Sequence, residues 1–203
     1  MKEVVQDLLE LPYTANRYGE ASHEDTIEQV FIAHGYTNND MRVPVATRDE
    51  ALEGADIEGL SNGEYISQPC GENNSPDFIV KSNDRLFFIE AKSSKSPTPT
   101  YNGGLPKEQY IYVFSSSQTN ETTVFLGSDV VNETKRGLLN DLTDELWAVV
   151  RKYQDMPEWA DDARGFDFYM RAMYTQSGGA IKKNYFTHED RAKAEGRVLA
   201  YCE

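Results

Sequence analysis

The feature that most constrains the fold is a pair of apolar segments joined by a short polar turn. Asp77–Lys81 and Arg85–Lys92 carry the β-branched and aromatic residues typical of strands, and Ser82–Asp84 between them suits a tight turn. The two segments are therefore predicted to form a β-hairpin. The second segment is apolar on both faces until Glu90, and strands of that kind lie inside a sheet that is covered on both sides.

The predicted elements on either side of this hairpin define the fold class. Helices are expected before it, and strands followed by helices after it. This order is typical of an α/β or α+β domain with a mixed central β-sheet flanked by helices. A length of 203 residues suits one domain. We expect 1–203 to form it, with a core at about 20–126 and a helical part at about 127–203.

Individual elements are predicted from periodicity, capping residues and turn residues. Ser22 is expected to cap a helix with an apolar stripe at Ile27, Val30 and Phe31 and an end at Gly35. The polar residues 37–75 are expected to form loops. The remaining predicted elements are a helix at Asp7–Leu11, strands at Arg42–Ala46, Tyr110–Ser115 and Thr122–Leu126, and helices at Asp129–Tyr153 with a break at Gly137, at Glu158–Tyr174 and at Glu189–Leu199.

The charge of the chain is strongly negative but uneven. A formal net charge of −14 argues against a protein that coats DNA passively, because polyanion binding depends on Lys and Arg. Residues 81–107, however, contain five basic and two acidic residues, and a local basic cleft would still steer DNA to one face. No apolar run reaches the ~20 residues of a membrane span, and Met1–Leu11 lacks the pattern of a secretory signal. The two distant cysteines fit a reduced, cytoplasmic compartment.

Three charged residues come together if the hairpin forms. Glu90 and Lys92 are two apart in one strand and point to the same face, while the hairpin brings Asp77 back toward Glu90. Two carboxylates at that range repel each other unless a cation lies between them, and hard oxygen ligands suit Mg²⁺. A lysine beside the metal can position a water and stabilise negative charge. The pattern therefore indicates metal-dependent hydrolysis of a phosphodiester.

This arrangement resembles the PD-(D/E)xK nuclease motif, with Pro76-Asp77, a gap of twelve residues, and Glu90-Ala91-Lys92. The resemblance implies a restriction-endonuclease-like core with Asp77, Glu90 and Lys92 as catalytic residues. It also implies that Asp77, Glu90 and the backbone carbonyl of Ala91 bind Mg²⁺. A further acid often comes from an upstream helix in this superfamily. Glu24 and Glu28 are the candidates, and Glu28 is preferred because it lies beside the apolar stripe.

The segment after the motif resembles type II restriction endonucleases in particular, because small hydroxyl residues and a second lysine follow it. The resemblance implies a bacterial, archaeal or virus-encoded enzyme that cleaves double-stranded DNA. It also implies a homodimer, since palindromic sites match a two-fold axis. The expected DNA-binding residues are Ser93, Ser94, Lys95, Asn102 and Lys107, and further candidates for phosphate contacts are Ser115, Ser116 and Ser117.

Two alternatives remain open. The same centre could serve a structure-selective nuclease, such as a Holliday-junction resolvase or a repair or phage nuclease, although small resolvases usually carry a strongly basic face. The chain could also be a non-catalytic DNA-binding or interaction module that keeps only the hairpin, although Asp77, Glu90 and Lys92 are all present. Cleavage of a plain duplex at fixed positions would favour a type II restriction endonuclease over a structure-selective nuclease. Absence of any Mg²⁺-dependent cleavage supports the module.

Overall fold

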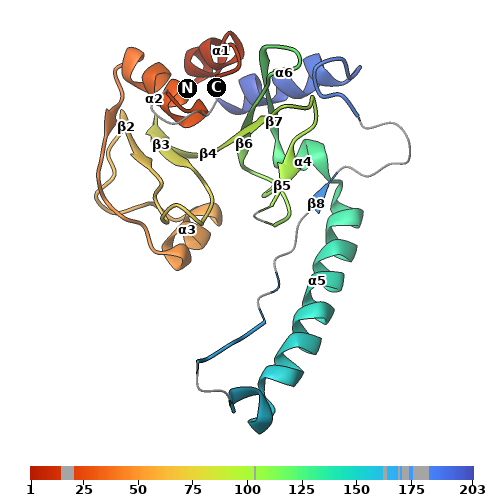
Figure 1. Ribbon diagram of the computed structural model, residues 1–203. Coiled ribbons are helices and arrows are strands. Elements are labelled where there is room, and N and C mark those ends of the chain that lie inside the picture. Colours follow the sequence, from red (N-terminus) through yellow and green to blue (C-terminus); the bar gives the residue numbers. More distant parts are fainter. Residues whose placement is uncertain (15–20, 103, 162–163, 169, 171–173, 176–182) are drawn as a thin grey trace.

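The computed structural model describes residues 1–203 apart from 15–20, 103, 162–163, 169, 171–173 and 176–182. Its centre is a mixed sheet whose strands are β1 (Thr37–Asn38), β2 (Glu64–Ser67), β3 (Phe78–Ser82), β4 (Arg85–Ser94), β6 (Ile111–Ser116) and β7 (Glu121–Leu126). They stand in the order β1-β2-β3-β4-β6-β7. Helices pack on both faces (Figure 1). The predicted α/β class with a mixed, helix-flanked sheet is therefore confirmed.

The predicted hairpin is formed by β3 and β4. The two strands pair antiparallel with Ser82 opposite Arg85, so only Asn83 and Asp84 form the turn. Both turn residues have positive φ, as a two-residue hairpin turn of this hand requires. On its other side β4 pairs in parallel with β6, which places it inside the sheet. The predicted hairpin is confirmed, but its turn is one residue shorter than predicted because Ser82 belongs to β3.

One face of the sheet is covered by α1 (Lys2–Leu9), α2 (His23–Ala33) and α6 (Arg191–Tyr201). The core on this side contains Phe87, Ile89 and Ala91 of β4 beneath Ile27 and Phe31 of α2, with further residues of α1 and α6. Ser22 caps α2 as predicted, because its hydroxyl accepts from the N–H of Asp25 at 3.0 Å and the Asp25 carboxylate accepts from Ser22 N–H at 2.6 Å.

The opposite face of the sheet carries a second, aromatic core. Phe88 of β4 stacks with Tyr110, and Tyr112 of β6 stacks with Phe125 of β7, at ring-centroid separations of 5.7 and 5.6 Å. Helix α3 (Val45–Leu52) contributes Ala51 to this core. β4 therefore supplies alternate residues to two separate cores, as its apolar composition predicts.

The region before the hairpin differs from the prediction. Residues 37–75 were expected to form loops with a strand at Arg42–Ala46, but they contain β1, α3 and β2. The strand prediction is wrong because α3 begins at Val45, directly after Pro44. Proline fixes a φ that suits a helix start and lacks the N–H that a strand ladder needs. The short helix expected at Asp7–Leu11 begins earlier, at Lys2.

The region after the sheet also differs. The break in the long helix is not at Gly137, because α5 (Glu133–Gln154) runs through it. The separation from α4 (Gly127–Val130) lies where Asn132 caps α5 by accepting from the Lys135 N–H at 2.9 Å. The helix expected at Glu158–Tyr174 is wrong over its described residues. A 3₁₀ turn, η1 (Pro157–Ala160), comes first, and the described residues 161, 164–168 and 170 that follow it are not helical; β8 is formed by Tyr174–Thr175.

β8 pairs antiparallel with β5 (Thr100–Tyr101), which lies in the loop that follows β4 in sequence. The chain thus returns from the end of α5 to the loop after β4, a long-range contact that local periodicity does not predict. Among the described residues, no helix combines the length and apolarity needed to cross a bilayer.

Candidate active site

The hairpin brings Asp77, Glu90 and Lys92 together at one end. Asp77 directly precedes β3, and the pairing of Phe78 with Ile89 places it next to Glu90 across the hairpin. Its Oδ2 accepts a hydrogen bond of 2.8 Å from the backbone N–H of Ala91. The three residues predicted to be catalytic therefore meet in the structure. Ala91, whose backbone carbonyl is predicted to bind the metal, is hydrogen-bonded to Asp77 through its N–H.

Glu90 and Lys92 form a largely buried ion pair. Lys92 Nζ donates to Glu90 Oε1 at 2.5 Å, and the side chains are only 18% and 11% exposed. Burial raises the pKa of Glu90 to about 7, and the negative charge of Asp77 acts in the same direction. Near neutral pH the Glu90 carboxyl group is therefore close to its pKa, and a nearby cation would favour its ionised form.

Asp77 is held by two donors in a buried position. Besides the Ala91 N–H, Nε2 of Gln68 donates to its Oδ1 at 3.0 Å. Burial raises the pKa of Asp77, while the N–H of Ala91 and the charge of Lys92 oppose the shift. Two adjacent carboxyl groups with raised pKa values are typical of a site that binds a cation, because the cation removes their mutual repulsion.

Three buried polar atoms around Asp77 have no hydrogen-bond partner among the described residues. They are Glu90 Oε2, Gln68 Oε1 and Nδ1 of His23. Gln68 bonds the Asp77 side chain directly. Glu90 interacts with Asp77 through charge and through the Asp77 backbone N–H, and His23 interacts with it through charge. Buried polar atoms are normally paired, so atoms of this kind gathered around one carboxylate fit a site that receives further ligands.

The residues present fit Mg²⁺ through a mixed donor set. No group of three or more His, Cys, Asp or Glu side chains converges on a metal position in the part of the chain that the structure describes. Asp77, Glu90 and the backbone carbonyl of Ala91 would instead supply two carboxylates and one carbonyl. Mg²⁺ commonly takes one or two carboxylates and keeps several waters, so this set suits it.

The structure distinguishes between the two upstream acids. Glu28 accepts a hydrogen bond of 2.7 Å from the hydroxyl of Tyr65, a residue of β2. Glu24, one turn earlier in α2, acts through its charge on both Asp77 and His23. Of the two acids, Glu24 is therefore the one whose charge acts on Asp77, whereas the sequence-based preference is for Glu28.

Some of the residues predicted to bind DNA lie near the ion pair. Lys107 lines a small cavity of about 30 Å³ together with Glu90 and Lys92. Ser93, Lys95 and Asn102 are exposed, on the end of β4 and on the loop that follows it. The hydroxyl of Ser94 lies 3.2 Å from that of Ser96 and accepts from the Ser96 N–H.

Two of the further candidates for phosphate contacts do not face outward. Ser115 and Ser116 are fully buried in β6, because this strand lies between β4 and β7 and is covered on both faces. The prediction that they contact phosphates is therefore wrong. Ser117, the first residue after β6, is exposed.

Sequence reasoning missed several residues that support the site. Gln68 lies at a positive φ after β2, and no local pattern links it to Asp77. His23 is the first residue of α2, buried, with Nε2 3.1 Å from the Val113 carbonyl oxygen. Arg48 of α3 is 7% exposed, and its Nη1 donates to the Ser75 carbonyl at 2.7 Å. Arg48 therefore anchors the segment that leads into Asp77.

Replacing Arg48 with alanine is expected to lower the free energy of unfolding by about 1–3 kcal/mol, because the partly buried Ser75 carbonyl loses its charged donor. Because that carbonyl belongs to Ser75, two residues before Asp77, the catalytic activity proposed below should also fall. Urea unfolding and initial cleavage rates measure the two effects. Arg151→Ala, at an exposed arginine of α5, is the control. If Arg48→Ala and Arg151→Ala have the same free energy of unfolding and the same cleavage rate, Arg48 does not support the site.

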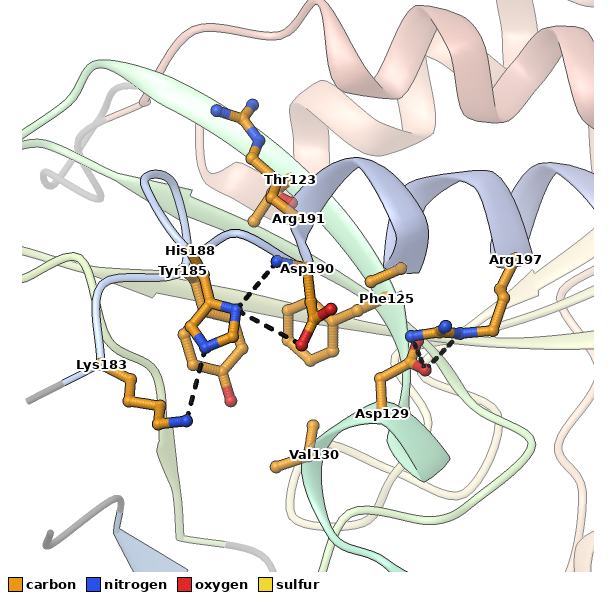
Figure 2. Close-up of a pocket in the computed structure, with 11 residues that line it drawn as sticks. Thr123, Phe125, Asp129, Val130, Lys183, Tyr185, His188, Asp190, Arg191 and Arg197 are labelled. Carbon is orange, nitrogen blue, oxygen red and sulfur yellow. Dashed lines mark hydrogen bonds and ion pairs between the residues drawn. The ribbon is translucent and has the colours of Figure 1, made fainter.

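A larger cavity of about 230 Å³ lies elsewhere, between β7, α4 and α6 (Figure 2). Its polar side chains are largely paired with one another. Arg197 contacts Asp129 at 2.6 Å, and Lys183 Nζ lies 3.4 Å from Nε2 of His188, whose other ring nitrogen accepts from the Asp190 N–H. Asp77, Glu90 and Lys92 do not line it. The cavity is therefore separate from the candidate active site.

Comparison with known proteins adds no assignment. No family model, no curated protein and no solved structure matches this chain. Interpretation of the site therefore depends on the geometry of Asp77, Glu90 and Lys92 and on the chemistry of the atoms around them.

Proposed function

We propose that this protein is a Mg²⁺-dependent DNA endonuclease of the PD-(D/E)xK type, and that a type II restriction enzyme describes it best. The observation that carries the proposal is the meeting of Asp77, Glu90 and Lys92 at one end of a central hairpin. The raised pKa of both carboxyl groups and the unpaired Oε2 of Glu90 support it, because each would be relieved by a bound cation.

The roles of the residues follow from their chemistry. Asp77, Glu90 and the carbonyl of Ala91 would hold Mg²⁺, and Glu24 is the acid best placed to add to them. When bound, Mg²⁺ lowers the pKa of a coordinated water and stabilises negative charge on a phosphate. Lys92 places a positive charge beside Glu90, where it would orient the attacking water and offset charge in the transition state.

Double-stranded DNA is the substrate that the surroundings of the site favour. Lys107 lines the cavity at the ion pair, and Lys95 is exposed shortly after β4 ends. These cations lie on an otherwise acidic chain of net charge −14. Because like charges repel a polyanion, DNA should approach the chain where its basic residues are concentrated. Phosphate contacts from Ser93, Lys95 and Lys107 would then fix the position of the duplex.

The proposal is tested by incubating the purified protein with a long unmethylated duplex, with Mg²⁺ or with EDTA, and separating the products on a gel. Discrete fragments that appear only with Mg²⁺ are the expected result, and their ends would reveal the recognition sequence. Asp77→Asn, which keeps the size of the side chain, should give none. A smear of products would indicate a non-specific or structure-selective nuclease instead of a restriction enzyme. Intact duplex and intact branched DNA under both conditions would favour a non-catalytic module.

A further inference from the structure

Helix α5 carries a row of apolar side chains that the described chain leaves exposed. Leu138, Leu142, Leu146, Val149 and Tyr153 are each between 48% and 66% exposed. Their spacing places them on one face of the helix, within an arc of about 80°. We call this row the α5 stripe. Isolated exposed apolar residues are ordinary on a protein surface, but a continuous row along one helix indicates an interaction surface.

The position of α5 leaves this stripe accessible. Figure 1 shows the helix projecting away from the sheet, and no residue of Glu133–Gln154 is buried. Arg136 fixes its first turn by donating to the carbonyls of Pro106 and Gly127. The returning chain is attached to a neighbouring face of the helix, where the hydroxyls of Thr143 and Tyr174 are 2.6 Å apart. At 1.5 Å per residue the helix is about 33 Å long, so the stripe spans most of an extended arm.

The charges on α5 indicate which class of partner fits. The helix carries four acidic and four basic residues, which are Glu133, Asp141, Asp144, Glu145, Lys135, Arg136, Arg151 and Lys152. A balanced helix of this kind lacks the excess of Lys and Arg that binds DNA phosphates or an anionic membrane surface. The partner of the α5 stripe is therefore expected to be a protein surface that is itself apolar.

We propose that the α5 stripe pairs antiparallel with the same stripe of a second copy of this chain. Asp141 and Lys152 border the stripe on the same side, five residues before and six residues after Leu146. With a two-fold axis near Leu146, Asp141 of each copy faces Lys152 of the other. In a parallel pair the edge of the stripe that carries Asp141 and Lys152 would face the opposite edge of the second copy, so these two residues would not meet. The Asp141–Lys152 pair thus forms only in the antiparallel orientation.

The same register brings the apolar residues into contact. With the axis near Leu146, the two copies of this leucine meet at the centre. Leu142 then lies between Val149 and Tyr153 of the second copy, so that side chains on the two helices alternate. Because five half-exposed residues form a small interface, association is expected to depend on protein concentration. The pairing needs neither Mg²⁺ nor DNA, and its test is independent of cleavage.

Sedimentation velocity over a wide range of protein concentrations, without Mg²⁺ or DNA, measures the association. The wild type should reach twice the chain mass of 23.0 kDa. The double variant Leu142→Asp, Leu146→Asp should remain at the mass of one chain, with the dissociation constant raised by roughly a hundredfold or more. The matched control, Asn140→Asp with Arg151→Gln, makes the same change of net charge on the exposed face opposite the stripe and should leave association unchanged. A wild type that stays monomeric throughout would overturn the proposal.

The orientation has its own test. Lys152→Glu should weaken association, because Asp141 of the second copy then faces a like charge. Adding Asp141→Lys to this variant exchanges the two charges and should restore the wild-type dissociation constant. If the exchanged variant associates no better than Lys152→Glu alone, the antiparallel register is wrong.

Discussion

Replacing Lys92 with alanine should abolish Mg²⁺-dependent DNA cleavage while leaving the fold intact. The ammonium group lies 2.5 Å from Glu90 at the candidate metal site, and the side chain is only 18% exposed. Loss of a group proposed to orient the attacking water and to stabilise the transition state should lower the rate by roughly a thousandfold or more. Binding of duplex DNA should be retained, because the contacts proposed from Ser93, Lys95 and Lys107 remain.

Single-turnover cleavage rates and gel-shift titrations separate these two effects. Lys193→Ala, which removes an exposed lysine of α6 far along the sequence from the site, is the matched control and should cleave at the wild-type rate. Far-ultraviolet circular dichroism checks that each variant is folded. If Lys92→Ala cleaves as fast as the control, the assignment of the catalytic lysine is wrong.

Replacing Glu90 with glutamine should also abolish cleavage, but it should stabilise the metal-free protein above neutral pH. Burial raises the pKa of Glu90 in the folded state from its ordinary 4.5 to about 7. The folded state therefore binds the proton more tightly than the unfolded chain does. The stability that this carboxyl group contributes is greatest below pH 4.5 and is lost as the pH rises from 4.5 to 7. The loss corresponds to roughly 3 kcal/mol above that range, since each pKa unit is worth about 1.4 kcal/mol.

The measurement is the free energy of unfolding in urea between pH 4.5 and 8, with EDTA and then with Mg²⁺. We expect the difference between Glu90→Gln and wild type to grow across this range in EDTA, and to shrink in Mg²⁺, which favours the ionised carboxylate. Glu72→Gln, at an exposed glutamate, controls for the overall negative charge. A difference that does not change with pH would show that the Glu90 carboxyl is not destabilised in the folded protein.

The meeting of Asp77, Glu90 and Lys92 could be predicted from the sequence because their geometry is local. A hairpin with a two-residue turn fixes its own register, so the alternation of residues in β4 already places Glu90 and Lys92 on one face and Asp77 beside them. The helix cap at Ser22 was predictable for the same reason, since the whole capping box lies within four residues.

The supporting residues could not be predicted because their contacts are long-range. Arg48 reaches the Ser75 carbonyl across 27 positions, and the segment that contains it has no clear apolar period. Gln68 meets Asp77 only because β2 pairs with β3. The pairing of β5 with β8 joins residues about 75 positions apart, and one residue in each of these two-residue strands is a tyrosine that packs like a core residue.

Strand β4 joins the two cores of the domain, and this has a consequence for how the protein responds to heat. Its residues alternate between the core under α2 and the aromatic core under α3, and Glu90 and Lys92 lie on the same strand. Melting of either core would release β4 and separate Glu90 from Asp77. Thermal inactivation should therefore follow the main cooperative transition of the sheet, even if the projecting α5 arm melts at a lower temperature.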